Sequence, residues 1–309
     1  MNIYQITYEP NYRVLGLHFW GCNLFCRGCY KNYWTDDLSL PGSSVEQLKD
    51  APRAKTPAIF LTLEEVLEKT EGLAPRDIFF MGKESSLDPE LPLLAARLHA
   101  RHKGFHTLLT NGVKLTDLSN IDEAVFGFKS ASESVHREYT GLSNLGIMNN
   151  FKKVYQNGKK LQAEIAFIPN LVEEEEIGAL AKTISEIDRK ILFRVTSYFA
   201  VPGAPWPAAS REQVEDAAAF ARKYLDDVVT MASDSRDNSW KPEVILGINM
   251  KLSGNAKIVL EKRYLKRDGD GSITESPEDM FRRVADAVAA AENAYNQQGK
   301  AACWADEFY

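Results

Sequence analysis

The chain has 309 residues, of which 44% are hydrophobic and 26% are charged, a balance typical of a soluble globular protein. Its formal net charge of −6 provides no basic field for a nucleic acid, and no apolar run approaches the roughly 20 residues of a membrane span. The first residues, MNIYQITYEPNYRV, lack the basic-then-apolar order of a secretory signal. We therefore expect a cytoplasmic protein that binds neither nucleic acid nor membrane and keeps its thiols reduced.

Short β-rich runs alternate with amphipathic helical patterns through the first two thirds of the chain. The β-rich runs predict strands at 13–20, 76–82, 105–112, 123–131, 161–170 and 191–203. Helical spacing of apolar residues predicts helices at 61–73, 88–104, 145–159, 172–188 and 210–225, with a weaker one at 44–50. The last of the strong helices begins with Ser210 as cap and Gln213 at capping-box spacing.

About six β-α units with hydrophobic strands predict an α/β fold in which helices cover a parallel sheet. Because a closed barrel has eight such units, we predict a partial barrel or a curved open sheet. Ligands of such sheets bind at the carboxyl ends of the strands. A cysteine-rich loop and the runs MGKE, TNG and FKSA all lie at such ends, so we predict that they form one site.

The composition changes near residue 232, where the run ASDSRDNSWKPE is polar and has no periodicity. We predict a first domain at 1–231, a linker at 232–250 and a short helical C-terminal segment at 251–309. Two helical patterns follow the linker, at 254–268 and 276–296. The second begins at Ser276, with proline at its first helical position.

Three of the four cysteines lie within eight positions, with the spacing C-x3-C-x2-C: Cys22, Cys26 and Cys29. In a reducing compartment, such a group indicates metal ligands or catalytic thiols rather than disulfides. Three thiolates can hold three irons of a [4Fe–4S] cube and leave the fourth iron open to a cofactor or substrate. Zinc would need a fourth ligand, and the nearest histidine, His18, precedes the loop within a strand. A chance grouping of structural cysteines is the remaining alternative.

The C-x3-C-x2-C spacing after the first predicted strand is the signature of the radical SAM superfamily, which residues 13–225 resemble. The resemblance implies a partial (β/α)6 barrel, a [4Fe–4S] cluster on the three cysteines and S-adenosyl-L-methionine at the open iron. One electron from the cluster then cleaves the sulfonium bond and gives a 5′-deoxyadenosyl radical. The run GCNLFCRGCYKNYW is similar to activating enzymes of anaerobic ribonucleotide reductase, with Lys31 in place of an asparagine. The run FKSASESVHREYTGLSN is similar to pyruvate formate-lyase activating enzymes.

The same resemblance implies a set of cofactor-binding residues: Tyr30, Gly82, Lys83, Glu84, Thr110, Asn111 and Lys129. The run MGKE matches a Gly-Gly-Glu motif whose backbone receives the methionine amino group, and Lys83 replaces its second glycine. Lys129 retains the lysine of an Asp-x-Lys motif, whereas Gly127 stands in place of the aspartate. Tyr30 follows the last cysteine, where an aromatic ring can pack near the adenine.

Several of these features have a structural alternative. Lys83 and Lys129 could be solvated strand ends, and VPGAPW at 201–206 could form either a lip of the site or a rigid turn. We expect His136 to be structural. We also expect Cys303 to be inert, because it is a single cysteine in a polar terminal stretch.

Residues 251–309 resemble the N-terminal helical segment of cobalamin-dependent (class II) ribonucleotide reductases, through VLEKRYLKRD and SPEDMFRRVADAVAAAE. The resemblance covers only the N-terminal part of that enzyme and includes neither its catalytic barrel nor its catalytic cysteines. The segment is therefore either the front of a longer fusion or a docking module retained alone.

These features predict a radical SAM oxidoreductase, most directly a glycyl-radical-enzyme activase of the anaerobic ribonucleotide reductase type. Its expected partners are a glycyl-radical enzyme or ribonucleotide reductase and a small electron donor of the flavodoxin or ferredoxin type. One alternative is a radical SAM enzyme that acts on a small molecule or peptide in cofactor maturation. Another is a non-catalytic iron–sulfur protein for electron transfer or docking, which would not cleave S-adenosylmethionine.

Overall fold

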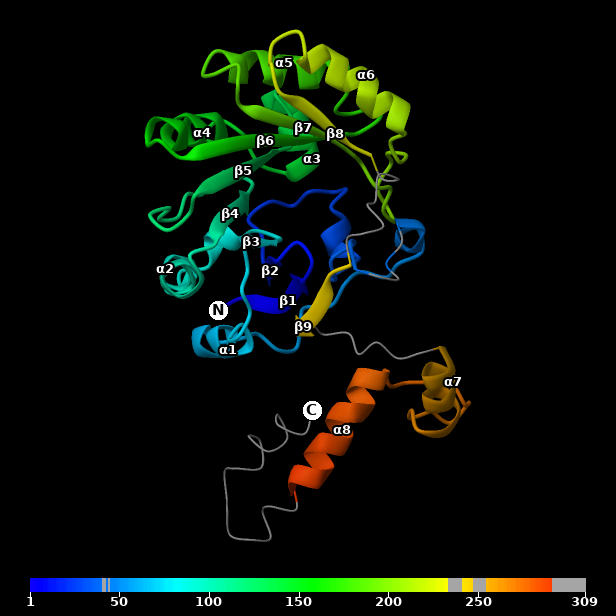
Figure 1. Cartoon of the computed structure of the whole chain (residues 1–309). Coiled ribbons are helices and arrows are strands. Elements are labelled where there is room, and N and C mark those ends of the chain that lie inside the picture. The colour runs from blue at the N-terminus through cyan, green and yellow to red at the C-terminus, as the bar shows by residue number, and fades with distance from the viewer. Residues whose placement is uncertain (41–42, 44, 233–240, 247–253, 291–309) are drawn as a thin grey trace. The chain divides into compact units, whose positions relative to one another are not determined.

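The computed structural model describes residues 1–40, 43, 45–232, 241–246 and 254–290 (Figure 1). The chain divides into two compact units, Met1–Ile248 and Asn249–Tyr309, and each is described by itself. Among the described helices, none combines the length and the apolar character that crossing a membrane requires. The candidate site lies in the first unit.

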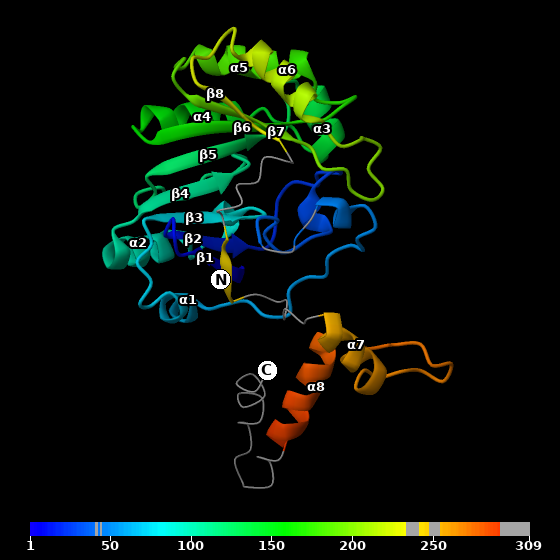
Figure 2. The ribbon, with the colours of Figure 1, turned by 45° about the vertical axis from the view of Figure 1, so that its right-hand side comes forward.

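A sheet of nine described strands forms the frame of the first unit (Figures 1 and 2). Its strands are β1 (Ile3–Glu9), β2 (Val14–Phe19), β3 (Asp77–Gly82), β4 (Phe105–Thr110), β5 (Glu123–Phe128), β6 (Lys160–Phe167), β7 (Leu192–Ser197), β8 (Val228–Met231) and β9 (Glu243–Leu246). Neighbours from β2 to β8 pair in parallel and in chain order. At the other edge, β1 is antiparallel to β2, and β9 is antiparallel to β1. This mostly parallel, open sheet confirms the predicted fold class.

Five helices between the parallel strands cover one face of the sheet: α1 (Leu63–Lys69), α2 (Leu91–His102), α4 (Ile147–Gln156), α5 (Glu174–Ser185) and α6 (Arg211–Ala221). A further helix, α3 (Glu133–Thr140), lies on the opposite side of β6 and β7 from α5 and α6. Every second residue of β6 is buried, as expected for a strand with one face under helices. One core packs β5–β7 against α4–α6 and contains the fully buried Phe126, Phe151 and Phe193. A second core packs β1–β4 against α1 and α2. Each fully buried phenylalanine contributes about 1.5–3 kcal/mol of hydrophobic stabilisation.

Three of the described strands were not predicted: β1 and β9 at one edge of the sheet and β8 at the other. The predicted linker at 232–250 contains β9, in which Leu246 pairs with Ile6 and Glu243 pairs with Tyr8. The linker prediction is wrong for these four residues, because the short apolar run at 244–246 pairs with the edge strand β1, a partner far away in the sequence. The weak helix predicted at 44–50 is a short 3-10 helix, η2 (Val45–Leu48).

A fully buried histidine lies on the face of β2 away from the helices. His18 Nε2 lies 3.0 Å from the Thr7 hydroxyl oxygen and 3.8 Å from the Asp37 carboxylate. Burial lowers the pKa of His18 to about 4, although Asp37 opposes this shift. The imidazole is therefore neutral in the folded protein at neutral pH.

We expect the free energy of unfolding to decrease as the pH falls from 6.5 to about 4. In this range the unfolded chain protonates His18 at its ordinary pKa of 6.5, whereas the folded protein does not. The difference corresponds to about 3 kcal/mol at the acid end of the range, at 1.36 kcal/mol per pKa unit. Urea unfolding at several pH values measures it, and the His18→Gln variant should show a shallower pH dependence. Equal slopes in both proteins would contradict the assignment.

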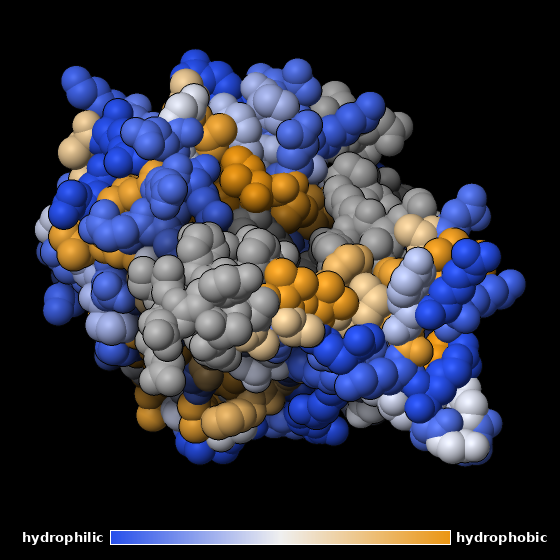
Figure 3. Space-filling model, turned by 90° about the horizontal axis from the view of Figure 1, so that it is seen from below, coloured by the Kyte–Doolittle hydropathy of each residue, from blue (hydrophilic) through white to orange (hydrophobic). Residues whose placement is uncertain are grey.

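The second unit contains α7 (Gly254–Arg263) and α8 (Pro277–Ala289), which lie within the two predicted helical patterns. Ser276 caps α8 by accepting a hydrogen bond from the Asp279 main-chain N–H. The Arg283 guanidinium pairs with the Glu275 carboxylate at 2.7 Å. Several apolar side chains of these helices are exposed, among them Ile258 and Val288, and Figure 3 shows apolar side chains interspersed with hydrophilic ones on the face seen from below. Cys303 lies outside the described residues.

Candidate functional site

The cysteine loop, residues 20–29, follows β2 at the carboxyl end of the parallel strands (Figure 2). Main-chain hydrogen bonds hold it against the end of α3: Phe25 N–H donates to the Thr140 carbonyl at 3.0 Å, and Arg27 N–H donates to the Tyr139 carbonyl at 2.9 Å. These contacts fix the loop from a helix more than 110 residues later in the chain.

The three cysteines of this loop are all free thiols. Cys22 is exposed, Cys29 is partly exposed, and Cys26 is buried in the core under β5–β7. Two donors already lie near the Cys22 sulfur: the Leu24 main-chain N–H at 3.4 Å and the Asn111 amide nitrogen at 3.7 Å. Such donors stabilise a thiolate that ligates iron.

Burial and the nearby Lys129 ammonium act in opposite directions on the pKa values of two of these thiols. Burial raises the pKa of Cys26 to about 12 and raises that of Cys22, while the nearby Lys129 ammonium opposes both shifts. Burial thus opposes the thiolate form that ligates iron, and Lys129 favours it. Within the described residues, no three histidine, cysteine or acidic side chains converge on one ion. The three cysteines place three thiol sulfurs on one short loop.

The strand ends next to the loop are joined by a buried carboxylate. Glu84 follows β3, is 1% exposed and accepts hydrogen bonds from the Thr110 hydroxyl at 2.7 Å and the Asn111 main-chain N–H at 2.6 Å. It also accepts from the Ser86 hydroxyl at 2.5 Å. Burial raises the pKa of Glu84, and these hydrogen bonds oppose the rise. The Glu84 carboxylate thus accepts its hydrogen bonds from groups of the protein itself, and these bonds align the ends of β3 and β4.

The end of β3 requires glycine and places a cation beside the loop. Gly82 has φ +110°, and a Cβ there would lie 2.5 Å from the Phe19 carbonyl oxygen. The next residue, Lys83, places its ammonium 3.6 Å from the centre of the Trp20 ring and 3.4 Å from the Asn32 side-chain oxygen. Burial lowers the pKa of Lys83. Lys83 is therefore a half-buried cation held at the loop rather than a freely solvated strand end.

The remaining predicted residues also gather at this end of the sheet. Asn111 donates from its amide nitrogen to the Asn23 side-chain oxygen at 2.7 Å, which ties the end of β4 to the cysteine loop. Lys129, after β5, acts electrostatically on Cys22 and Cys26. The Tyr30 ring lies edge-on to Phe199 at 5.9 Å between centroids. The structure thus brings the predicted set together around the loop.

An aromatic cluster after β7 closes the other side of the loop. Trp206 is buried and packs edge-on against Tyr139 at 5.5 Å and Tyr198 at 6.4 Å. The Arg27 guanidinium of the cysteine loop lies 5.0 Å from the Trp206 ring centre. The segment at 201–206 therefore packs on the loop. Neither Tyr198 nor Asn23 was among the predicted site residues, although the absence of a side chain at Gly28 was a signal that another residue fills that space.

His136 lies beside this cluster on α3 and is fully buried. Its Nδ1 lies 2.8 Å from the Leu142 carbonyl oxygen and 3.1 Å from the Thr140 hydroxyl oxygen. These partners fix the turn that ends α3, which agrees with the structural role expected for this residue.

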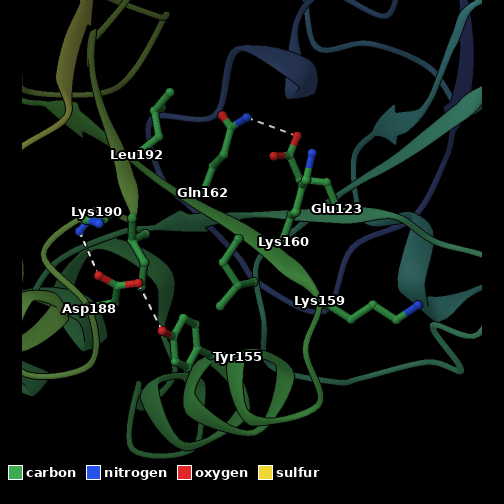
Figure 4. A pocket seen from close by; sticks show the side chains of 10 residues that line it. Glu123, Tyr155, Lys159, Lys160, Gln162, Asp188, Lys190 and Leu192 are labelled. Atoms are coloured by element: carbon green, nitrogen blue, oxygen red, sulfur yellow. Dashed lines mark hydrogen bonds between the residues drawn. The ribbon is translucent and has the colours of Figure 1, made fainter.

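A cavity of about 320 Å³ lies elsewhere, at the amino ends of β6 and β7 (Figure 4). Leu192 and Gln162 line it, together with Tyr155, which donates a hydrogen bond to Asp188 at 2.9 Å. The cysteine loop lies at the carboxyl ends of the parallel strands, which are opposite to their amino ends. This cavity is therefore separate from the cysteine loop.

Comparison with known proteins gives two family matches and three curated relatives, of which two are described here. The profile of the "Ribonucleotide reductase, all-alpha domain" matches residues 250–309. There, 48 residues are 50% identical to the vitamin B12-dependent ribonucleoside-diphosphate reductase of Thermoplasma acidophilum and span 6% of that protein. A Methanocaldococcus jannaschii protein, named provisionally as a glycyl-radical enzyme activating enzyme, is 27% identical over 73% of this chain and 84% of its own length.

Solved structures share the fold of the first unit. TYW1 with a lysine-pyruvate adduct bound has a TM-score of 0.51 at 14% identity, over 79% of this chain and 84% of that one. Streptococcus suis SuiB has a TM-score of 0.50 at 14% identity, over 72% of this chain and 48% of that one. The profile of the "Radical SAM superfamily" matches residues 17–182, more than half of the chain, and includes all three cysteines of the loop. The chain therefore belongs to the radical SAM superfamily, whose members use a [4Fe–4S] cluster and S-adenosylmethionine.

Proposed function

We propose that this radical SAM enzyme activates a glycyl-radical enzyme by abstracting a hydrogen atom from a backbone glycine. The main support is the similarity to the Methanocaldococcus jannaschii protein, because the alignment covers most of both chains. The name of that protein assigns it to this activity. The run of residues 21–34 supports the same class.

The site residues have distinct proposed roles. Cys22, Cys26 and Cys29 hold the cluster, which together with S-adenosylmethionine supplies the hydrogen-abstracting radical. The ends of β3 and β4, at Gly82, Lys83, Glu84, Thr110 and Asn111, form the S-adenosylmethionine site with Lys129 and Tyr30. Lys83 supplies a cation held by Trp20, which suits a carboxylate ligand. Glu84 positions the main chain of Asn111 rather than contacting the cofactor.

The proposed partner is a ribonucleotide reductase of the glycyl-radical type. The support is residues 250–309, which match a reductase domain on the same chain as the radical SAM domain. The matched relative is named as vitamin B12-dependent, and the match spans only 6% of it. The segment therefore supports a link to ribonucleotide reduction, and the cysteine-loop sequence supports the glycyl-radical route.

An electron paramagnetic resonance experiment tests the proposal. Protein loaded anaerobically with iron and sulfide is reduced by flavodoxin or dithionite and mixed with S-adenosylmethionine and a candidate anaerobic reductase. We expect a glycyl-radical doublet on the reductase and formation of 5′-deoxyadenosine, and neither should appear when S-adenosylmethionine is omitted. Formation of 5′-deoxyadenosine without a doublet on cognate reductases would overturn the activase assignment and favour a small-molecule or peptide substrate.

A further inference from the structure

Tyr198 fills the space beside the cysteine loop that a side chain at Gly28 would occupy. The residue follows β7 and is 4% exposed. A Cβ added to Gly28 would lie 2.7 Å from the Tyr198 hydroxyl oxygen and 2.7 Å from its ring carbon Cε2. Because Gly28 lies between Cys26 and Cys29 in the loop, the phenol packs directly against the segment that carries two of the iron ligands.

The hydroxyl of Tyr198 has no hydrogen-bond partner among the described residues. The Val201 main-chain N–H faces the phenolic oxygen of Tyr198 without completing a hydrogen bond. The hydroxyl proton of Tyr198 is therefore not donated to any acceptor among the described residues. Burial raises the pKa of Tyr198 to about 12, which keeps that proton on the oxygen at neutral pH. A buried polar group without a partner is costly, and its persistence at a binding site indicates a ligand.

Three other tyrosines of the first unit do donate hydrogen bonds from their hydroxyls, unlike Tyr198. Tyr4 donates to the Thr35 carbonyl at 2.6 Å, and Tyr33 donates to the Pro202 carbonyl at 2.6 Å. Tyr155 donates to the Asp188 carboxylate at 2.9 Å. Tyr198 packs edge-on against Trp206 and is buried, so solvent does not supply the missing partner.

We propose that the Tyr198 hydroxyl donates a hydrogen bond to a sulfur atom at the Cys29 corner of the cluster and thereby raises the reduction potential of the cluster. When the protein is loaded with iron and sulfide, thiolate and sulfide sulfurs of the cluster become available as hydrogen-bond acceptors beside Tyr198. Reduction adds negative charge to them, and a hydrogen bond stabilises that charge. Tyr198 is a positioning and tuning residue here, and its role does not depend on which substrate the radical attacks.

Potentiometric titration followed by electron paramagnetic resonance tests the proposal on the full chain loaded with iron and sulfide. Tyr198→Phe removes only the hydroxyl, so we expect a more negative midpoint potential at unchanged iron and sulfide content. Tyr155→Phe, at the opposite ends of the strands, is the matched control and should leave the potential unchanged. Equal midpoint potentials in the wild type and Tyr198→Phe would overturn the proposal.

A second measurement separates hydrogen bonding from a packing effect. After exchange into heavy water, pulsed electron–nuclear double resonance of the reduced cluster should show a coupled deuteron that is absent from Tyr198→Phe. Tyr139→Phe should retain that deuteron, and its loss there instead would assign the donor to Tyr139 and overturn the proposal. If Tyr198→Phe does not retain four irons, Tyr198→Met repeats the titration, and failure of both variants to hold iron would show that Tyr198 only supports the loop.

Discussion

Replacing Cys26 with alanine is expected to abolish cleavage of S-adenosylmethionine while leaving the protein folded. Cys26 supplies one of the three proposed iron ligands, and the remaining two cannot hold the cluster in a single arrangement. Loss of groups that merely support metal ligands costs about 10–100-fold in affinity or activity, so loss of a ligand should exceed this range. Iron content and 5′-deoxyadenosine formation, measured anaerobically, are the readouts.

The fold should survive this change because the removed atom is small. Cys26 is 9% exposed in the core under β5–β7, and removing its sulfur should lower the free energy of unfolding by about 1 kcal/mol. Circular dichroism and thermal unfolding establish that the variant is folded. The matched control is Cys303→Ala, which changes the remaining cysteine of the sequence and should retain iron and activity. Normal iron content in Cys26→Ala would contradict the assignment of the ligands.

Replacing Glu84 with alanine is expected to destabilise the protein strongly and to impair the cofactor site as well. Its carboxylate accepts hydrogen bonds from Thr110, Asn111 and Ser86, and the site is closed to water. Each buried donor left without an acceptor costs about 1–3 kcal/mol, so the three donors together should lower the free energy of unfolding by about 3 kcal/mol or more. Urea unfolding measures the change.

Two further variants separate the hydrogen bonds of Glu84 from its charge. Glu84→Gln keeps one acceptor oxygen but turns an amide nitrogen toward existing donors, so its loss of stability should be intermediate. Glu175→Ala replaces an exposed glutamate on α5 and should change stability by less than about 0.5 kcal/mol. If Glu84→Ala unfolds at the same urea concentration as the wild type, the proposed alignment of β3 and β4 is wrong.

The parts of the fold that the sequence predicts well have a strong local signal. β3 contains a hydrophobic run, and every second residue of β6 is apolar and buried. Ser210 and Gln213 mark the start of α6, and they form the capping box in the structure. β9 has only four residues, follows a polar stretch and depends on a partner more than 230 residues earlier. Its existence follows from tertiary pairing, which local patterns do not contain.

The candidate site shows the same division between local and long-range information. The cysteine spacing and the runs at the strand ends are contiguous in the sequence, so their residues could be named in advance. The packing of Tyr198 on Gly28, and the hydrogen bond between Asn23 and Asn111, join segments 88 or more residues apart. The role of Glu84 as an internal anchor also depends on such contacts, because the motif alone does not reveal whether its carboxylate faces a ligand or the protein.

The pairing of β9 with β1 affects how the two units can be separated for individual study. A chain cut at the change of composition near residue 232 would lose β9 and leave the main-chain groups of β1 unpaired along an exposed border. An unpaired edge strand can pair with strands of other molecules. The shortened protein should therefore aggregate, whatever its catalytic activity. An excised radical SAM unit therefore needs to extend through Leu246 to keep its sheet intact.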